Sequence, residues 1–209
     1  DMVKVLCAYN MKRQSGMASM VAKKGLGDAY GKAVLVAFLE EESLTSGCIL
    51  QCDPESAVWV ILKQVAKEFP EVSARKTPKD SKGSNGGVER FHQSVRGLTR
   101  TTKESMMRRY KLASMGTDHK LVPWMLRHSG FCHTRLQKHA SGLTGFEART
   151  GKAYDQELYE IGETILWLQP GEERAKFKRR WDSRIWLGRD PKTTEHLIGT
   201  SAVLKQLPL

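Results

Sequence analysis

The sequence predicts an α/β protein with a mixed sheet flanked by helices, followed by a small, mostly β unit at the C-terminal end. Apolar runs typical of strands and of helices alternate over residues 3–75 in the order strand, strand, helix, strand, helix, strand. A long amphipathic helix follows at 88–112. Beyond residue 153 the pattern changes to short basic and aromatic runs. We therefore expect a core over 1–153 and a second, basic unit over 154–209.

Two strands and a helix are expected at the start of the chain. The run 3–9 is rich in strand formers, and a polar turn over 11–16 precedes a second strand at 17–22. Asp28 is a candidate N-cap for a helix over 29–42. The apolar face of that helix would consist of Ala33, Val34, Val36, Ala37 and Phe38.

A strand, a helix and another strand should complete the first sheet. The strand over 48–52 ends at Asp53, and Pro54 suits the first turn of a helix that continues to Phe69. Pro70 closes this helix, and a brief strand follows at 72–75.

A polar, glycine-rich segment over 76–87 leads into the longest helix. It has no apolar period, so we expect a mobile surface loop, and loops of this length in compact domains are often functional. An ordinary linker is the alternative. The helix over 88–112 should bury one stripe, formed by Val88, Phe91, Val95, Leu98, Thr102 and Met106.

Further helices are expected over 121–139 and 144–149, and strands in the C-terminal unit. The helix over 121–139 offers Trp124, Leu126, Phe131 and Leu136 as core candidates. The C-terminal unit should contain strands at 163–168, 186–189 and 196–200, a turn at 170–173, and an alternating basic and aromatic segment over 176–187.

The charge of the chain favours a polyanionic partner. The net charge of +11 fits nucleic acid or a membrane surface, although a merely basic soluble protein is the alternative. No apolar run approaches the ~20 residues that a membrane span needs, and no signal peptide is recognised. The chain starts with Asp1 rather than Met, so we expect a fragment.

The four cysteines indicate a reducing, intracellular setting. Cys48 and Cys52 fall on one face of a predicted strand, and no CxxC pair occurs. His128 and Cys132 stand four residues apart on a predicted helix, which could ligate a metal. No second pair at zinc-finger spacing completes such a site, so a packed helix is the favoured interpretation.

Asp53 and Glu89 are the candidate catalytic acids. Asp53 stands at a strand end, and Glu89 stands in the first turn of the long helix, with 35 residues between them. Two carboxylates that converge can hold Mg²⁺ or Mn²⁺, which prefer oxygen ligands and keep bound water. Such an ion can activate a water or a hydroxyl for attack on a phosphodiester.

A second stripe on the long helix continues from Glu89 as a basic track. Its members lie within roughly 40° of the direction of Glu89 around the helix axis. They are Gln93, Arg96, Arg100 and Lys103. A charged stripe is usually a solvated face, but one with a carboxylate at its head and few acids among its bases suits a phosphate backbone.

Several of these segments resemble the catalytic core of retroelement and retroviral integrases. The resemblance rests on Cys52-Asp53-Pro54-Glu55 and on the segment 77–90, with Asn-Gly before the glutamate, followed by Gln93-Ser94-Val95-Arg96. The segments 123–128 and 144–152 resemble the final helices of that core, and the part after 155 resembles, less specifically, the tail that follows it in retrotransposon polyproteins.

The resemblance implies an RNase H-like fold and metal-dependent integration of element DNA into a target, with 3′-end processing and strand transfer. It places the second and third catalytic acids at Asp53 and Glu89, and DNA contacts at Gln93 and Arg96. We add Arg100 and Lys103, and Lys79 and Lys82 from the loop, as further DNA contacts. DNA and further copies of the chain are the expected partners, and the nucleus is the expected location.

The sequence departs from the family pattern at the first catalytic acid. The family carries an aspartate on a strand that precedes the strand at 3–9, and Asp1 stands too close to that strand to serve. We expect the first strand and its acid to lie upstream; substitution by Asp1 or decay of the element are the alternatives. The His/Cys zinc module of the family has no counterpart before residue 53. The rival functions are a DNA-binding remnant without catalysis, an RNase H-fold nuclease, and a scaffolding or assembly module.

Overall fold

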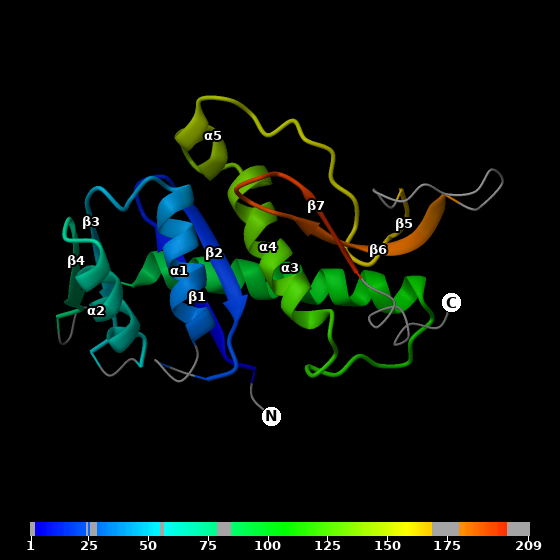
Figure 1. The fold of residues 1–209 in the computed structure, drawn as a ribbon, viewed down its shortest axis with the longest axis horizontal. Coiled ribbons are helices and arrows are strands. Elements are labelled where there is room, and N and C mark those ends of the chain that lie inside the picture. Colours follow the sequence, from blue (N-terminus) through cyan, green and yellow to red (C-terminus); the bar gives the residue numbers. More distant parts are fainter. Residues whose placement is uncertain are drawn as a thin grey trace.

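The computed structural model describes residues 3–23, 25, 29–54, 57–78, 85–168 and 180–199. Helices and strands follow each other in the predicted order (Figure 1). The elements are β1 (Val5–Asn10), β2 (Ser15–Met20), α1 (Ala29–Glu41), β3 (Cys48–Cys52), α2 (Val58–Glu68), β4 (Val72–Lys76), α3 (Gly86–Arg109), α4 (Val122–Leu136), α5 (Gly145–Thr150), β5 (Thr164–Leu168), β6 (Trp181–Arg189) and β7 (His196–Gly199). Asp1, Asp28, Lys79, Lys82 and the turn predicted at 170–173 lie outside the described residues. None of the described helices is long and apolar enough to cross a bilayer.

The strands form three small sheets where a single mixed sheet was expected for the core. β1 and β2 make an antiparallel hairpin, in which Val5 lies opposite Met20. β3 and β4 pair in parallel, and β5, β6 and β7 form a separate antiparallel sheet. Within the described residues no ladder joins β1 to β3. The α/β class is therefore confirmed, while the core strands are divided into an antiparallel pair and a parallel pair.

One apolar layer nonetheless underlies both pairs of strands. Its buried members are Leu35, Leu39, Ile61, Leu62, Val65 and Val72, from α1, α2 and β4. Ala8 of β1 and Leu50 of β3 both pack against this layer. The predicted apolar face of α1 was partly wrong, because Ala33 and Ala37 are exposed and the larger Leu35 and Leu39 are buried instead. Bulkier side chains remove more apolar area from water, so they decide the rotation of the helix.

Helix α4 lies directly against the β1–β2 hairpin. The Thr134 hydroxyl accepts a hydrogen bond from the Gly16 amide and donates one to the Gly16 carbonyl, both at 2.9 Å. Gly130 permits this close approach, since a Cβ at that position would lie 3.0 Å from the backbone nitrogen of Ala18. Phe91 and Val95 of α3 complete this part of the core. Leu136, a predicted core residue, is instead 53% exposed at the end of α4.

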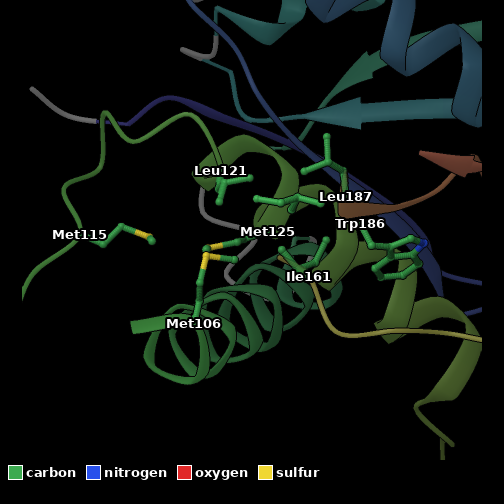
Figure 2. Packing of buried hydrophobic residues seen from close by; sticks show 8 residues of the cluster. Met106, Met115, Leu121, Met125, Ile161, Trp186 and Leu187 are labelled. Carbon is green, nitrogen blue, oxygen red and sulfur yellow. The ribbon is translucent and has the colours of Figure 1, made fainter. Parts of the chain in front are cut away.

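A third apolar cluster joins the C-terminal sheet to the two long helices. Figure 2 shows Met106 of α3 beside Met125 of α4, with Leu187 and Trp186 of β6 in the same cluster. Trp186 is completely buried, and its indole nitrogen donates to Nδ1 of His196 at 2.9 Å. The cluster contains residues from both sides of position 153. The domain boundary at residue 153 stays a prediction from the sequence.

Two glutamates at the end of α1 hold a buried group of charges together. Arg135 of α4 donates to Glu41 Oε1 at 2.8 Å, and Arg149 of α5 donates to the same oxygen at 3.1 Å. Glu42 is wholly buried and accepts from the Asn10 side-chain amide at 3.0 Å. Burial lowers the pKa of Arg135, and the neighbouring Glu41 opposes that shift. Charges at these depths are tolerated because they are paired.

Gly130→Val should destabilise the protein by about 1–3 kcal/mol, because the added side chain meets the β2 backbone, which cannot rotate away. Urea unfolding measures the change. Gly97→Ala in α3 is the matched control: a Cβ there has nothing within 4 Å, so stability should stay equal or rise by up to about 1 kcal/mol. Equal stability of Gly130→Val and the native protein would contradict this packing.

Acid should destabilise the fold through His128, whose Nε2 lies 3.2 Å from Cys132 Sγ and whose ring packs on Trp186. Burial lowers the pKa of His128 to about 4 from 6.5. Between these values the unfolded chain binds a proton that the folded chain does not, so the free energy of unfolding falls as the pH drops from 6.5 to 4. The loss is about 3 kcal/mol for this group. His128→Gln should make the fall shallower in urea titrations; an identical slope would contradict the assignment.

Candidate acidic site and nucleic-acid interface

The C-terminal ends of β3 and β4 meet at one edge because the two strands are parallel. Asp53 directly follows β3, and Thr77 directly follows β4. The Thr77 hydroxyl donates to the Cys52 carbonyl at 2.9 Å and lies 3.5 Å from Asp53 Oδ1. The Thr77 amide also donates to the Cys52 carbonyl at 2.9 Å. These bonds fix the backbone on which Asp53 is carried.

Asn85 connects Asp53 to the helix that carries Glu89. It stands at the N-cap of α3, and its side-chain amide donates to Asp53 Oδ1. Its backbone carbonyl accepts from the Glu89 amide at 3.0 Å, which closes the first turn of α3. Its side-chain oxygen lies 3.4 Å from the amide nitrogen of Gln51 in β3. One residue therefore contacts both the strand-end acid and the turn in which Glu89 stands.

The chemistry of these donors fits a hard divalent cation. Asp53 and Glu89 are both exposed carboxylates, and the α3 N-terminus carries Glu89 in its first turn. Oxygen donors open to water suit Mg²⁺ or Mn²⁺, which retain several waters. Within the described residues no group of three or more His, Cys, Asp or Glu side chains is arranged so that it could hold a metal ion. The described part of the site thus offers two acids.

Polar partners of Asp53 were not singled out from the sequence. Asn85, Thr77 and Gln51 all contact the site, and Arg75 donates to Gln51 at 2.7 Å. Thr77 could have been found from the parallel register, since it follows the residue opposite Cys52. Asn85 carries a local signal as well, because asparagine is a common N-cap before a helix.

The predicted basic track lies along the solvent side of α3. Gln93, Arg96 and Arg100 are exposed, and Lys103 is half-buried. Figure 1 shows α3 running from the β3–β4 pair to the C-terminal sheet, and the track follows the part of this helix from Glu89 to Lys103. The predicted core stripe is only partly correct: its members Phe91, Val95 and Met106 are buried, whereas Leu98 is 38% exposed.

The α/β fold is similar to that of a retroviral integrase catalytic core, as comparison with a solved structure shows. The catalytic core domain of BIV integrase is similar, with a TM-score of 0.50 and 11% sequence identity over 70% of this chain and 85% of that chain. At this sequence identity the structural likeness shows a similar fold alone.

A chain of the simian T-cell lymphotropic virus intasome in complex with the PP2A regulatory subunit B56 gamma also matches. Its TM-score is 0.48 at 11% identity, over 89% of this chain and 63% of that chain, which is too low to add to the argument. No model of a protein family matches the sequence, and no curated protein matches it.

Proposed function

We propose that this chain carries part of the active site of a metal-dependent polynucleotidyl transferase that processes 3′ ends of DNA and joins them to a target. The observation that carries the proposal is the connection made by Asn85, which links Asp53 to the turn bearing Glu89 at the head of a basic helix face. The likeness in fold to an integrase core supports it.

Asp53 and Glu89 would hold Mg²⁺ or Mn²⁺. When bound, such an ion lowers the pKa of a coordinated hydroxyl and stabilises charge on a phosphodiester oxygen. Asn85 and Thr77 orient the Asp53 carboxylate through hydrogen bonds, and so limit its rotation. The guanidinium groups of Arg96 and Arg100 would bind backbone phosphates and position the DNA without reading its sequence. Assembly of several copies stays a prediction.

We place the first acid of the RNase H-like fold on a strand that is encoded upstream and that would lie between β1 and β3 in space. The division of the core strands supports this, because one apolar layer contacts both Ala8 and Leu50 although no ladder joins their strands within the described residues. A strand paired to β1 and β3 would unite the two pairs. The test is activity of a chain extended by the residues encoded upstream: an extension that leaves activity unchanged would count against this placement.

A DNA-binding module without catalysis is the second candidate. The observation that favours it is the pair of acids, since the described residues contain no group of three or more His, Cys, Asp or Glu that could hold a metal ion. A gel-shift assay run in parallel with a nicking assay in Mn²⁺ separates the two functions. Binding without nicking, in the extended chain as well, favours the module.

Glu89→Gln should reduce Mn²⁺-dependent strand joining by the extended chain at least about 100-fold, equivalent to about 2.7 kcal/mol in the barrier. It should also weaken Mn²⁺ binding, measured by electron paramagnetic resonance, while DNA affinity stays nearly unchanged. Glu104→Gln is the matched control, since Glu104 is an exposed glutamate on the same helix. Full joining activity in the Glu89 variant would sink the assignment.

Arg96→Ala should weaken duplex DNA binding and lower the slope of log affinity against log salt concentration by about one unit, because one phosphate contact is lost. Fluorescence anisotropy over a salt series measures this slope. Lys67→Ala is the control: Lys67 is exposed in the last turn of α2, next to the start of β4 and hence at the opposite edge from Asp53. If the slope is equal for both variants, the basic face of α3 does not bind the DNA backbone.

A further inference from the structure

A cavity of about 590 Å³ lies beside the first turns of α3, and the proposed function leaves it without a role. Residues of the β1–β2 hairpin, the start of α3 and the end of α4 with its following loop line it. Cavities of roughly 300–1,000 Å³ are typical of small-ligand sites. Arg90 lines the cavity and lies about 100° around the helix from Glu89, so the cavity adjoins the basic track.

Aromatic rings line one side of this cavity. The rings of Tyr9 and Phe91 are stacked with centroids 5.3 Å apart, and His133 meets Phe91 edge-on at 4.8 Å. His139 lies 5.6 Å from His133 and continues the series. Phe91 and His133 are held in the core, while Tyr9 and His139 are partly exposed toward solvent. The exposed parts offer flat surface on which another ring can stack.

Two polar atoms among these rings have no hydrogen-bond partner in the part of the chain that the structure describes. His133 is only 3% exposed, and its Nδ1 has no hydrogen bond to any described residue. Nε2 of His139 is likewise buried and unpaired within the described structure. Both histidines line the cavity, so the polar edge of a ligand bound there can supply the missing hydrogen bonds. Burial lowers the pKa of His133 to about 4, which leaves its ring neutral and able to accept a hydrogen bond at neutral pH.

The charged residues in the described lining of the cavity are basic. Arg90 and Lys138 are exposed at its margin, and its lining contains no aspartate or glutamate. A ligand with negative charge is therefore favoured. Aromatic surface, unpaired histidine nitrogens and two cations together match a ligand that joins an aromatic ring to a phosphate.

We propose that this cavity binds one unpaired nucleotide, with its base against Tyr9 and His139 and its phosphate at Arg90 and Lys138. The proposal rests on the proposed function, because the basic track on α3 would lead a DNA strand to Arg90. Stacking on aromatic side chains tolerates any base, so no sequence preference is expected. A nucleotide at a strand end and a free mononucleotide share this chemistry.

The test compares a blunt DNA duplex with the same duplex carrying two unpaired nucleotides at one end. The native chain should bind the second about five- to tenfold more tightly in fluorescence anisotropy, as expected for stacking of one base. Ser94, which lines the cavity and is half-buried, supplies the matched variants. Ser94→Glu places a carboxylate among the cations and should abolish the preference, whereas the isosteric Ser94→Gln should retain more of it.

Lys138→Ala, at an exposed position, tests the cavity without disturbing the core and should also reduce the preference. Adenosine monophosphate, titrated calorimetrically, identifies the source of the ligand. If it removes the preference but leaves blunt-end binding intact, the strand end occupies the cavity. If it binds, Ser94→Glu prevents this, and no end preference exists, a free nucleotide is the ligand.

Equal affinity for both duplexes, together with no binding of the mononucleotide, overturns the proposal. The proposed function survives that result if duplex binding still depends on Arg96. If no duplex binds at all, the proposed function is wrong. The calorimetric titration alone then shows whether the cavity binds a nucleotide.

Discussion

The core depends on the charges buried at the end of α1. Glu41 and Glu42 follow one another there, and they receive hydrogen bonds from the hairpin, from α4 through Arg135 and from α5 through Arg149. A buried charge without its partner would destabilise the fold far more than the loss of an apolar contact would. The hairpin, α4 and α5 must therefore dock at the end of α1. The directional bonds of the cluster specify one arrangement where apolar contact alone would tolerate several.

Helix α3 connects this rigid centre to the site. Its apolar side packs on the hairpin and α4 through Phe91 and Val95, and its N-cap, Asn85, reaches the end of β3. The position of Glu89 is thus set by packing some turns further along the helix. The same rigidity carries the exposed guanidinium groups of Arg96 and Arg100 in a fixed line from the acids. A long, straight polyanion is the natural complement of such a line.

The sequence predicted the order and type of the elements because period-2 and period-3.6 patterns are local. It also predicted that Asp53 ends a strand and that Glu89 opens a helix. The predicted apolar face of α1 and the predicted burial of Leu98 and Leu136 were wrong, because burial depends on which segments from elsewhere in the chain pack against a helix. The role of Asn85 could not be derived for the same reason: its partner, Asp53, lies 32 residues away. The cavity beside α3 requires three elements at once and has no linear signal.

The paired hydrogen bonds between Gly16 and Thr134 bridge 118 residues of chain. They therefore form late, since closure of so long a loop carries a large entropic cost that is recovered only when α4 docks. During synthesis the hairpin emerges well before α4 and must wait, with one apolar face uncovered, until the residues between them and α4 itself have followed. The slowest step of folding should accordingly be the closing of α4 over the hairpin, and that is the stage at which the nascent chain is most exposed to aggregation.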